Sequence, residues 1–569
     1  MSSTAVGSSS GWSARVPRAR PRSEGRGSPT ISTSPSPSSG RPGSKRSPGP
    51  SARRPEMCGV VGVVSPGQQA AGLAALALFA LQHRGQESAG VAVSDGEGVM
   101  VYKDLGMVAT VLDERRLPSL RGEAAIAHCR YSTTGSTRWE NSQPAFRLGP
   151  LRTVAVGHNG NLVNTRELLA RLPGGKRRLQ GTTDTEVLTA LLASQPGGDL
   201  VEALLGLLPA LRGAYALVVM DERRVIGLRD PFGFRPLVLG RLPAQAVVAH
   251  PPPADRPGGL EAAPLWPAGS GLADEPPPSL AGGWVLASET AALDLLGAEV
   301  VREVAPGEMV VLEAGQPPRS ITFAAGREHL CVFELIYFAR PDSYLLGRNL
   351  YEARRRMGEA LAREAPAAAD IVIPVPDTGA PAAAGYAEAS GLPYREGMVK
   401  NRYAGRTFIQ PSQRQRQRGV DMKLSALREQ VRGRRLVVVD DSIVRGTTTR
   451  QIVSLLRRAG ASEVHLRISA PPIYHPCFYG IDTSIETELI ASRLEPEALR
   501  AHLGADSLAY LSIGGVLGAL ELPYERFCFA CFDGRYPEPV PYDVAAHKFI
   551  LEADEETEPP VADPLLAAR

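Results

Sequence analysis

The most constraining feature of this 569-residue chain is the run from Arg435 to Thr449, where an apolar stretch leads into two acids and a turn of small residues. Arg435–Val439 is rich in β-branched residues, as buried strands are, and Thr448–Ala459 has the apolar spacing of a helix. A strand, a tight loop and a helix in this order leave backbone N–H groups at the helix N-terminus, where an anion binds well. The run therefore predicts a phosphate site.

Residue types within this run suit a phosphorylated sugar. Gly446 allows the backbone to approach a ligand closely, and the hydroxyls of Thr447 and Thr448 add donors. Asp440 and Asp441 follow the strand, where carboxylates suit ribose hydroxyls or the oxygen shell of Mg²⁺. An N-capping turn with two surface acids is the alternative, which a lone Asp-Asp pair would favour.

Strands and helices alternate around this run from about residue 327. Ile371–Ile373 and Val464–Ser469 have the composition of buried strands, and Ala380–Ala389 that of a helix. This alternation predicts a doubly wound parallel sheet.

A second candidate for chemistry is Cys58, which directly follows Met57 and opens the buried-strand run Cys58–Val64. If Met57 is removed, the α-amino group of Cys58 lies beside its thiol. With an unperturbed pKa of about 7.7–8.0, that amine can accept the thiol proton without help from another side chain. The alternative is a small core residue at the start of a strand.

The chain after Cys58 mixes strands and helices in a way that indicates an α+β domain with stacked sheets. A Pro/Ala/Gly-rich insertion at 241–282 interrupts it and has the composition of a semi-flexible linker. The expected strands are 124–131, 152–157, 214–220, 225–229 and 284–287, and the expected helices are 69–82, 165–172, 185–193 and 200–211.

Residues 1–56 differ from the rest of the chain. They hold ten Lys and Arg against two Glu, whereas the whole chain carries a net charge of +3. This Ser/Pro/Gly/Arg-rich segment lacks the apolar area to offset chain entropy, so we expect it to be disordered. This segment has three interpretations: a nucleic-acid-binding arm, a transit peptide, or an upstream extension that is cleaved or never made. We favour the third, because Met57 could itself be the first residue translated.

Composition excludes several classes of protein. The longest apolar stretch, Ala71–Leu81, is too short to cross a bilayer, and no apolar signal-peptide core opens the chain. We therefore expect a cytoplasmic protein with no membrane partner. Six Cys do not make a disulfide scaffold. Cys528 and Cys531 form a C-x-x-C pair, which taken alone fits a redox pair, half a zinc site, or chance.

The run from Arg435 to Thr449 resembles the phosphoribosyl-pyrophosphate (PRPP) motif of type I phosphoribosyltransferases. Together with Lys400–Tyr403, Gly405–Ile409 and Val332–Ser343, it is similar to the amidophosphoribosyltransferase family. The resemblance covers roughly 58–240 and 283–535, without the insertion. The resemblance implies that residues 58–300 form an α+β amidotransferase domain of the N-terminal-nucleophile type, folded as an αββα sandwich. Residues 301–535 would form an α/β type I phosphoribosyltransferase domain with a parallel sheet, followed by a tail at 536–569. Residues 1–57 would be a disordered extension or a propeptide.

The resemblance also implies roles for residues of the first domain. Cys58 would attack glutamine, and the Asn159 side chain and the Gly160 backbone N–H would form the oxyanion hole. Arg130 would hold the α-carboxylate of glutamine and Asp184 its α-ammonium group. His83–Glu87 fits the family as well. We expect His128 and His158 to be structural.

In the second domain the resemblance implies a PRPP site, a magnesium site and a cluster. Lys400–Gln410 would be a loop that closes over PRPP and keeps water from C1. The PRPP contacts would be Lys400, Asp440, Asp441, Ser442, Arg445, Gly446, Thr447 and Thr448; the Mg²⁺ ligands would be Thr378, Asp440 and Asp441; and Cys331, Cys477, Cys528 and Cys531 would hold the [4Fe–4S] cluster of one subclass.

The implied reaction is glutamine + PRPP + water → 5-phosphoribosylamine + glutamate + pyrophosphate, the committed step of purine biosynthesis. Tyr131 and Ile409 match positions that line the path of ammonia. Purine nucleotides would inhibit, and the protein would be a homodimer or homotetramer that binds no nucleic acid. Another N-terminal-Cys glutamine amidotransferase is one alternative, but it would lack the Asp440–Thr449 motif. A non-catalytic PRPP-sensing regulator is the other, but it would not need Cys58 together with its companions.

Overall fold

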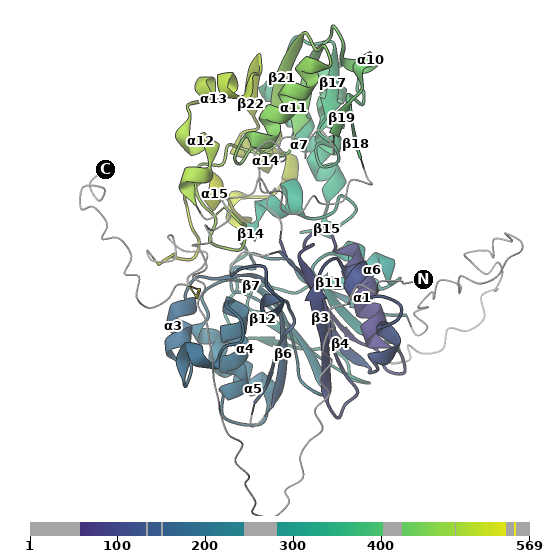
Figure 1. The fold of residues 1–569 in the computed structure, drawn as a ribbon, viewed down its shortest axis with the longest axis vertical. Helices are drawn as coiled ribbons and strands as arrows, with labels where there is room; N and C mark the ends of the chain where they lie inside the picture. The colour runs from purple at the N-terminus through teal and green to yellow at the C-terminus, as the bar shows by residue number, and fades with distance from the viewer. Residues whose placement is uncertain are drawn as a thin grey trace, which may run out of the picture.

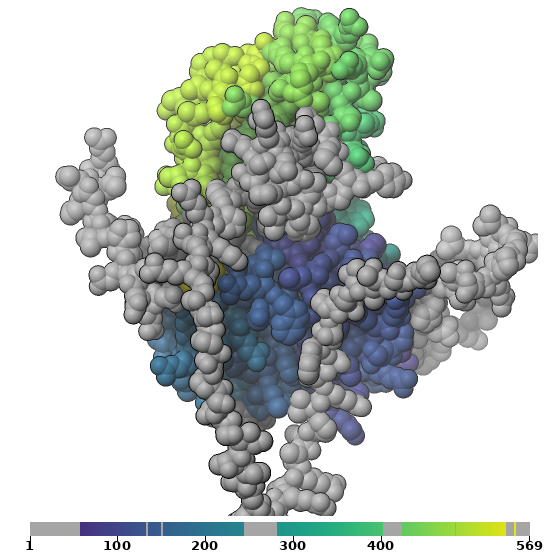
Figure 2. Space-filling view, in the orientation of Figure 1, coloured from purple at the N-terminus to yellow at the C-terminus, as the bar shows by residue number. Residues whose placement is uncertain are grey.

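The computed structural model describes residues 57–131, 135–149, 152–243, 282–401, 424–483, 485–541 and 551–552. These residues form two lobes, one built from the first half of the chain and one from the second (Figure 1). In the space-filling view the purple-to-blue residues and the green-to-yellow residues form two masses, one below the other (Figure 2). The predicted segments 1–56 and most of the 241–282 insertion lie outside the described residues.

The first lobe contains two antiparallel sheets. The seven-stranded sheet has the order β11 (Glu299–Glu303), β9 (Val238–Arg241), β10 (Trp284–Ala287), β1 (Gly59–Val64), β4 (Ala124–Arg130), β2 (Ser88–Ser94) and β3 (Val99–Leu105). The six-stranded sheet has the order β13 (Arg319–Thr322), β12 (Glu308–Glu313), β8 (Arg224–Arg229), β7 (Gly213–Met220), β6 (Thr153–Leu162) and β5 (Ala145–Leu148).

Apolar side chains alternate along these strands and so build four layers. On β1, Val60 and Val64 pack between the two sheets, whereas Val61 and Val63 pack against the outer helices. Successive side chains of a strand point to opposite faces, so a strand covered on both faces is apolar throughout. The outer layers are α1 (Ala70–Ala80) and α6 (Thr290–Leu295) on the first sheet, and α3 (Thr165–Ala170), α4 (Asp184–Ser194) and α5 (Leu200–Leu207) on the second. The predicted αββα sandwich is confirmed.

The second lobe contains a four-stranded parallel sheet, as predicted. On β20 (Arg435–Asp440), Val437 and Val439 face one hydrophobic cluster, and Leu436 and Val438 face another. The strand order is β17 (Ile371–Pro374), β20, β21 (Glu463–Ile468) and β22 (Ser507–Tyr510). One face is covered by α7 (Leu350–Glu364), α8 (Ala380–Ser390) and α14 (Ile513–Leu520), and the other by α11 (Thr447–Arg458) and α13 (Pro496–Leu503).

Small elements complete this lobe and join it to the first. A π-helix, Glu334–Phe338, lies where the lobes meet. Other short elements of this lobe are α10 (Arg428–Val431), α12 (Ile490–Arg493) and α15 (Ala530–Asp533), the pair β18 (Met398–Lys400) and β19 (Leu424–Ala426), the pair β14 (Leu330–Cys331) and β23 (Phe527–Cys528), and the pair β15 (Tyr344–Leu345) and β16 (Arg348–Asn349). The short helix α2 (Val108–Val111) belongs to the first lobe.

The predicted domain boundary at residue 300 is wrong. Strand β12 pairs with β8 and with β13, so the first domain continues through Thr322. The boundary at 535 is also too early, because Tyr536 packs on the cysteine pocket and the Glu538 carboxylate pairs with Arg212. Within the described residues, no helix is both long and apolar enough to cross a bilayer.

Candidate functional site

Cys58 lies immediately before β1 and is buried. Its Sγ donates to the carbonyl oxygen of Tyr131 at 3.4 Å, and its own carbonyl accepts a hydrogen bond from Nε of Arg84 at 3.0 Å. Met57 precedes it and is also buried, at 1% exposed. Burial raises the pKa of the Cys58 thiol to about 11, which keeps it protonated near neutral pH while Met57 is attached.

The two predicted glutamine-binding side chains lie within the electrostatic reach of Cys58. Gly59 pairs with Cys129, so Cys58 and Arg130 lie at the same end of β1 and β4. Burial is the main cause of the raised pKa of Cys58; the positive charge of Arg130 opposes it, and the negative charge of Asp184 adds to it. The chain thus brings together a cation and an anion, Arg130 and Asp184, the two kinds of charge that bind an α-amino acid.

Asp184 is held at the first residue of α4. One of its carboxylate oxygens accepts from the backbone N–H of Leu162 at 2.9 Å, and the other from the N–H of Thr185 at 2.8 Å. The Leu162 contact fixes the carboxylate beside the end of β6, the strand that carries Asn159 and Gly160. The nucleophile, Arg130 and Asp184 come from three elements that converge at one end of the sandwich.

Asn159 is fully buried, and neither its Nδ2 nor its Oδ1 has a hydrogen-bond partner among the described residues. Buried side-chain amides are nearly always satisfied, so such a group requires an explanation, such as a ligand oxygen that it binds. Gly160 follows with φ +148, and a Cβ there would lie 2.1 Å from the carbonyl oxygen of Ala214. Both features suit the predicted oxyanion hole.

The two histidines near the nucleophile make structural contacts. Nε2 of His128 lies 3.1 Å from the carbonyl oxygen of His158, and burial lowers the pKa of His128 to about 3, so it stays neutral. Nε2 of His158 lies 3.2 Å from the carbonyl oxygen of Ala214. These contacts agree with the expectation that neither histidine serves as the base.

The acids predicted to face PRPP lie at the carboxyl end of β20, and both are 3% exposed. The backbone N–H of Asp441 donates to Asp440 at 3.0 Å, and the Ser442 hydroxyl donates to Asp441 at 2.6 Å. The Thr378 hydroxyl also donates to the Asp441 carboxylate, although 63 residues separate them. The three predicted magnesium ligands therefore lie together.

The predicted phosphate loop runs from β20 into α11. Gly446 caps the helix with φ +70, and no side chain caps the helix N-terminus. The first helical residue, Thr447, is exposed, and Thr448 is half-buried. The Arg445 guanidinium is paired with Glu488 across 2.9 Å from Nε to Oε2. Backbone N–H groups of a helix N-terminus thus lie open beside the acids, as an anion site requires.

Lys400 ends the described part of the predicted closing loop. Its Nζ lies 2.7 Å from Asp377, and both side chains are exposed. Residues 402–410, including Ile409, lie outside the described residues.

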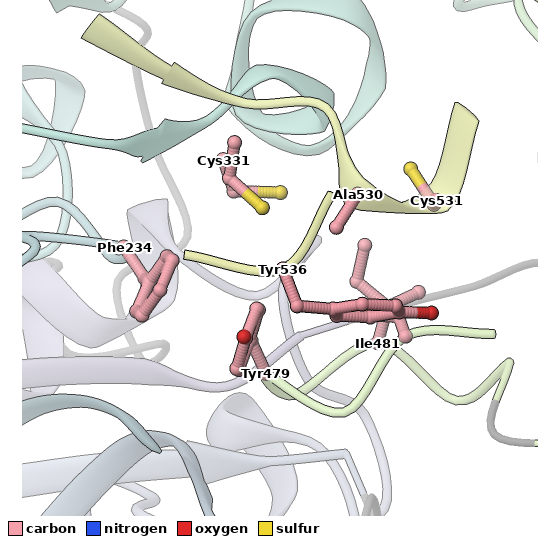
Figure 3. A pocket seen from close by; sticks show the side chains of 9 residues that line it. Phe234, Cys331, Tyr479, Ile481, Ala530, Cys531 and Tyr536 are labelled. Carbon is pink, nitrogen blue, oxygen red and sulfur yellow. The ribbon is translucent and has the colours of Figure 1, made fainter. Parts of the chain in front are cut away.

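The four predicted cluster ligands line one pocket between the lobes (Figure 3). Cys331 of β14 and Cys528 of β23 are register partners in a parallel strand pair, and both cysteines are free thiols. Burial raises the pKa of Cys331 to about 11, an effect that nearby Arg235 opposes. Burial and then Cys331 and Cys477 raise the pKa of Cys531. The pocket is lined by Phe234, Cys331, Cys477, Tyr479, Ile481, Cys528, Ala530, Cys531 and Tyr536.

Two protein-family models match this chain, each over a different part of it. A glutamine amidotransferase domain model matches residues 128–251, and a phosphoribosyl transferase domain model matches residues 342–476. An amidophosphoribosyltransferase of Mycobacterium tuberculosis is 49% identical over 509 residues, which is 87% of this chain and 89% of that protein. The chain belongs to the amidophosphoribosyltransferase family. This membership confirms the resemblance seen in the sequence and the prediction of a glutamine-dependent phosphoribosyltransferase.

Further members of the family agree. The amidophosphoribosyltransferase of Synechococcus elongatus is 46% identical over 504 residues, 87% of this chain and 94% of that protein. The solved glutamine PRPP amidotransferase of B. subtilis, complexed with ADP and GMP, is 41% identical with a TM-score of 0.73, over 85% of this chain and 98% of that one. A solved allosteric regulatory enzyme of purine biosynthesis is 42% identical with a TM-score of 0.74, over 86% and 97%.

Two features of the site were not predicted from the sequence. Glu552, in the predicted tail at 536–569, accepts from the backbone N–H of Ser136 at 2.7 Å and from the Thr182 hydroxyl at 2.8 Å. Arg84 and Glu334 form a buried ion pair beside Cys58. Arg84 and Glu334 lie in stretches that fit the family pattern and Glu552 lies beyond them, but the sequence neighbours of all three residues give no signal of their pairing.

Proposed function

We propose that this chain makes 5-phosphoribosylamine from PRPP, with ammonia released from glutamine, as the committed step of purine biosynthesis. One observation carries the proposal: a buried cysteine within electrostatic reach of Arg130 and Asp184 occurs in the same chain as a phosphate loop preceded by Asp440 and Asp441. Neither site alone would require the other.

In the proposed glutaminase step, Cys58 has become the first residue, and its α-amino group accepts the thiol proton. The sulfur attacks the amide carbon, and the Asn159 amide and the Gly160 N–H stabilise the negative oxygen that forms. The carbon–nitrogen bond breaks and ammonia leaves with a proton from the amine. Water then hydrolyses the thioester and releases glutamate.

In the proposed transferase step, ammonia reaches C1 of PRPP without meeting bulk water, which would protonate it. Tyr131, which is buried beside Cys58, is our candidate for the start of this path, and Ile409 is a candidate for its end. The N-terminus of α11 would bind the 5-phosphate, and Asp440 and Asp441 would face the ribose. Ammonia forms the new bond to C1 as pyrophosphate departs.

Thr378, Asp440 and Asp441 are the residues that we propose to hold Mg²⁺. Their oxygens lie together and include two buried carboxylates, which suits a hard cation. Bound Mg²⁺ would supply charge neutralisation of the leaving pyrophosphate.

We further propose that Cys331, Cys477, Cys528 and Cys531 hold a [4Fe–4S] cluster with a structural role. Burial raises the pKa of the Cys331, Cys528 and Cys531 thiols, so only a strongly cationic centre would bind them as thiolates. Among the described residues no three His, Cys, Asp or Glu side chains meet as the ligands of one ion would. A four-iron cluster holds its thiolates farther apart than one ion does.

Iron analysis of anaerobically purified protein tests the cluster. We expect a brown protein with about four irons per chain, the content of one such cluster. Stoichiometric zinc without iron would refute the assignment.

We also propose that purine nucleotides inhibit the enzyme, that it is a cytoplasmic homodimer or homotetramer, and that it binds no nucleic acid. The B. subtilis relative is complexed with ADP and GMP, which supports the first of these proposals. Added purine nucleotides should therefore lower the rate of PRPP consumption.

The experiment that tests the proposed reaction is a PRPP-dependent glutaminase assay on protein whose first residue is Cys58. We expect glutamate, pyrophosphate and 5-phosphoribosylamine in equal amounts. If PRPP and glutamine together gave no glutamate from folded protein, the chain would instead be a PRPP-sensing regulator.

A further inference from the structure

A group of four charged side chains, Arg84, Arg235, Glu289 and Glu334, is fully buried where the lobes meet. Arg84 contacts both carboxylate oxygens of Glu334 through a single nitrogen, with Nη2 2.8 Å from Oε1 and 3.0 Å from Oε2. Buried ions are costly unless they are paired and hydrogen-bonded, so this group persists only as a complete set. Its first member comes from the first lobe, and Glu334 comes from the π-helix of the second.

One side of this charged group contacts the backbone of Cys58, the proposed nucleophile, through Arg84. Arg84 donates from Nη1 to Glu289 at 2.6 Å and from Nη2 to Glu334, which together orient its guanidinium. The third donor, Nε, then points to the carbonyl oxygen of Cys58 at 3.0 Å. The planar guanidinium allows little freedom, so the two acids determine where the Cys58 backbone sits.

The other side of this group contacts, through Arg235, the segment that packs against Gly160 of the proposed oxyanion hole. Nη1 of Arg235 lies 3.4 Å from Glu334, and its Nε and Nη2 lie 3.1 and 2.5 Å from the carbonyl oxygen of Tyr479. The next residue, Gly480, packs against Gly160 so closely that a Cβ on it would lie 3.0 Å from the Gly160 carbonyl carbon. Asn161 adds a bond to the same segment, from Nδ2 to the carbonyl oxygen of Phe478 at 2.9 Å.

We propose that Glu334 is a positioning residue for the glutaminase step. Glu334 contacts both Arg84, which holds the Cys58 backbone, and Arg235, which holds the segment that packs behind Gly160. The inference rests on the proposed role of Cys58. Glu334 touches no substrate; it acts through the two arginines, from an element of the opposite lobe. A π-helix is rare and is frequent at functional sites, which agrees with this use of Glu334–Phe338.

The proposal predicts that replacing the carboxylate would displace the nucleophile and leave the PRPP site intact. Glu334→Gln keeps the shape but leaves two buried arginines without their shared charge. We expect kcat for glutamine hydrolysis to fall about a hundredfold, the effect of a misplacement of about 1 Å. Because no contact to glutamine is lost, its KM should change by less than about threefold.

Three readouts on protein that begins at Cys58 separate positioning from general damage. These are kcat and KM for glutamine, the rate of PRPP consumption with added ammonia, and the rate of Cys58 alkylation by iodoacetamide. Ammonia-driven synthesis should stay within about threefold of the unmodified rate, whereas alkylation should slow. The matched control is Glu308→Gln in β12 of the first lobe, where the buried carboxylate contacts Arg302 at 2.7 Å and accepts from the backbone N–H of Ala305 rather than from a member of this charged group. It should change neither glutaminase nor synthesis.

Unchanged kcat in a folded Glu334→Gln protein would overturn the proposal, and so would an equal loss of ammonia-driven synthesis. If Glu334→Gln fails to fold, Arg84→Lys decides instead, because it keeps a charge opposite both acids but removes the Nε donor. Loss of glutaminase with retained ammonia-driven synthesis supports the proposal there, and undiminished glutaminase overturns it. Cys58→Ser is run alongside: if it keeps glutamine-driven synthesis, the proposed role of Cys58 fails, whatever Glu334→Gln shows.

Discussion

At the scale of single residues, the structure distinguishes buried side chains that form hydrogen bonds within the fold from buried side chains whose polar atoms are left for a ligand. Asn159 and Asn164 are both buried asparagines of the same domain. Asn164 donates to the carbonyl oxygen of Ala210 at 2.9 Å and accepts from the N–H of Arg212 at 3.2 Å, whereas Asn159 has no partner among the described residues. A buried amide of the second kind contributes nothing to folding, so its contribution must lie in binding or catalysis.

This contrast predicts opposite effects of two alanine variants. Asn159→Ala should lower kcat for glutamine hydrolysis by about 10²–10³, the effect of losing one oxyanion donor, and leave the free energy of unfolding unchanged or higher. Asn164→Ala, the control, should lower the free energy of unfolding by about 1–3 kcal/mol and leave kcat nearly intact. Steady-state kinetics and urea unfolding check both. A stability loss without a rate loss at Asn159 would contradict the assignment.

The pKa of Cys58 gives a second prediction at this scale. With Met57 attached, burial raises the pKa of the thiol to about 11, and only the thiolate reacts with iodoacetamide. Below that pKa the thiolate fraction, and hence the alkylation rate, should rise about tenfold for each pH unit between pH 7 and 10. Peptide mass spectrometry of the labelled protein measures it. A plateau below pH 9 would show that the thiol ionises more readily than its burial allows.

At the scale of elements, the sequence predicted the strand–loop–helix unit of the proposed PRPP site well, because its strand, Arg435–Asp440, and its helix, Thr447–Arg458, are contiguous in the chain. Gly446 has φ +70, a backbone region that suits glycine, and a Cβ there would lie 2.7 Å from Cδ1 of Ile490. Gly433, in the turn before β20, has φ +71 and nothing within 4 Å of a Cβ. The two glycines therefore differ in their surroundings and hardly at all in backbone conformation.

Alanine at each glycine tests the loop. Both variants should lose about 1–2 kcal/mol of unfolding free energy, the cost of a left-handed backbone for a residue with a Cβ. Gly446→Ala should also raise the KM for PRPP about tenfold or more, because the loop that binds phosphate must shift. Calorimetry and kinetics separate the effects. Equal KM values in the two variants would argue against a phosphate site at this loop.

Elements that depend on distant partners were predicted less well. The predicted boundary at residue 300 placed Glu308–Glu313 in the second domain, yet this strand pairs with Arg224–Arg229, some 80 residues earlier. Asn159 and Gly160 were recognised as site residues, but β6 extends five residues past its predicted end at Gly157. Glu334 resembles any other acid in the sequence, and only the fold shows that it is buried between two arginines. Long-range pairing has no local signal.

At the scale of the whole molecule, the two lobes share a hydrophobic core. Met57, Val163 and Phe234 of the first domain belong to the same cluster as Leu335 and Phe478 of the second. The cysteine pocket lies within this shared hydrophobic cluster, and residues of both lobes line the pocket. A group bound there would therefore stabilise the docking of one lobe on the other, and the glutaminase site would depend on it through the Tyr479 carbonyl.

Removing one of the four cysteines proposed to hold the iron–sulfur cluster tests this dependence. Cys331→Ala should lose its iron, lower Tm by several degrees, and reduce glutamine-driven synthesis more than ammonia-driven synthesis, because segment 477–480 loosens behind Gly160. Cys129→Ala is the control, since Cys129 is equally buried but lies in β4, away from the pocket. It should keep its iron. Iron content, Tm and both rates are measured. Full iron in Cys331→Ala would exclude that cysteine as a ligand.

The central claim is that nitrogen passes from glutamine, through Cys58, to PRPP in the second lobe. Its most direct test is the ratio of glutamine-driven to ammonia-driven synthesis in Cys58→Ser, measured on protein that begins at residue 58. The account predicts that glutamine-driven synthesis disappears while ammonia-driven synthesis remains near its original rate. Glutamine-driven synthesis at an undiminished rate in that variant would contradict it.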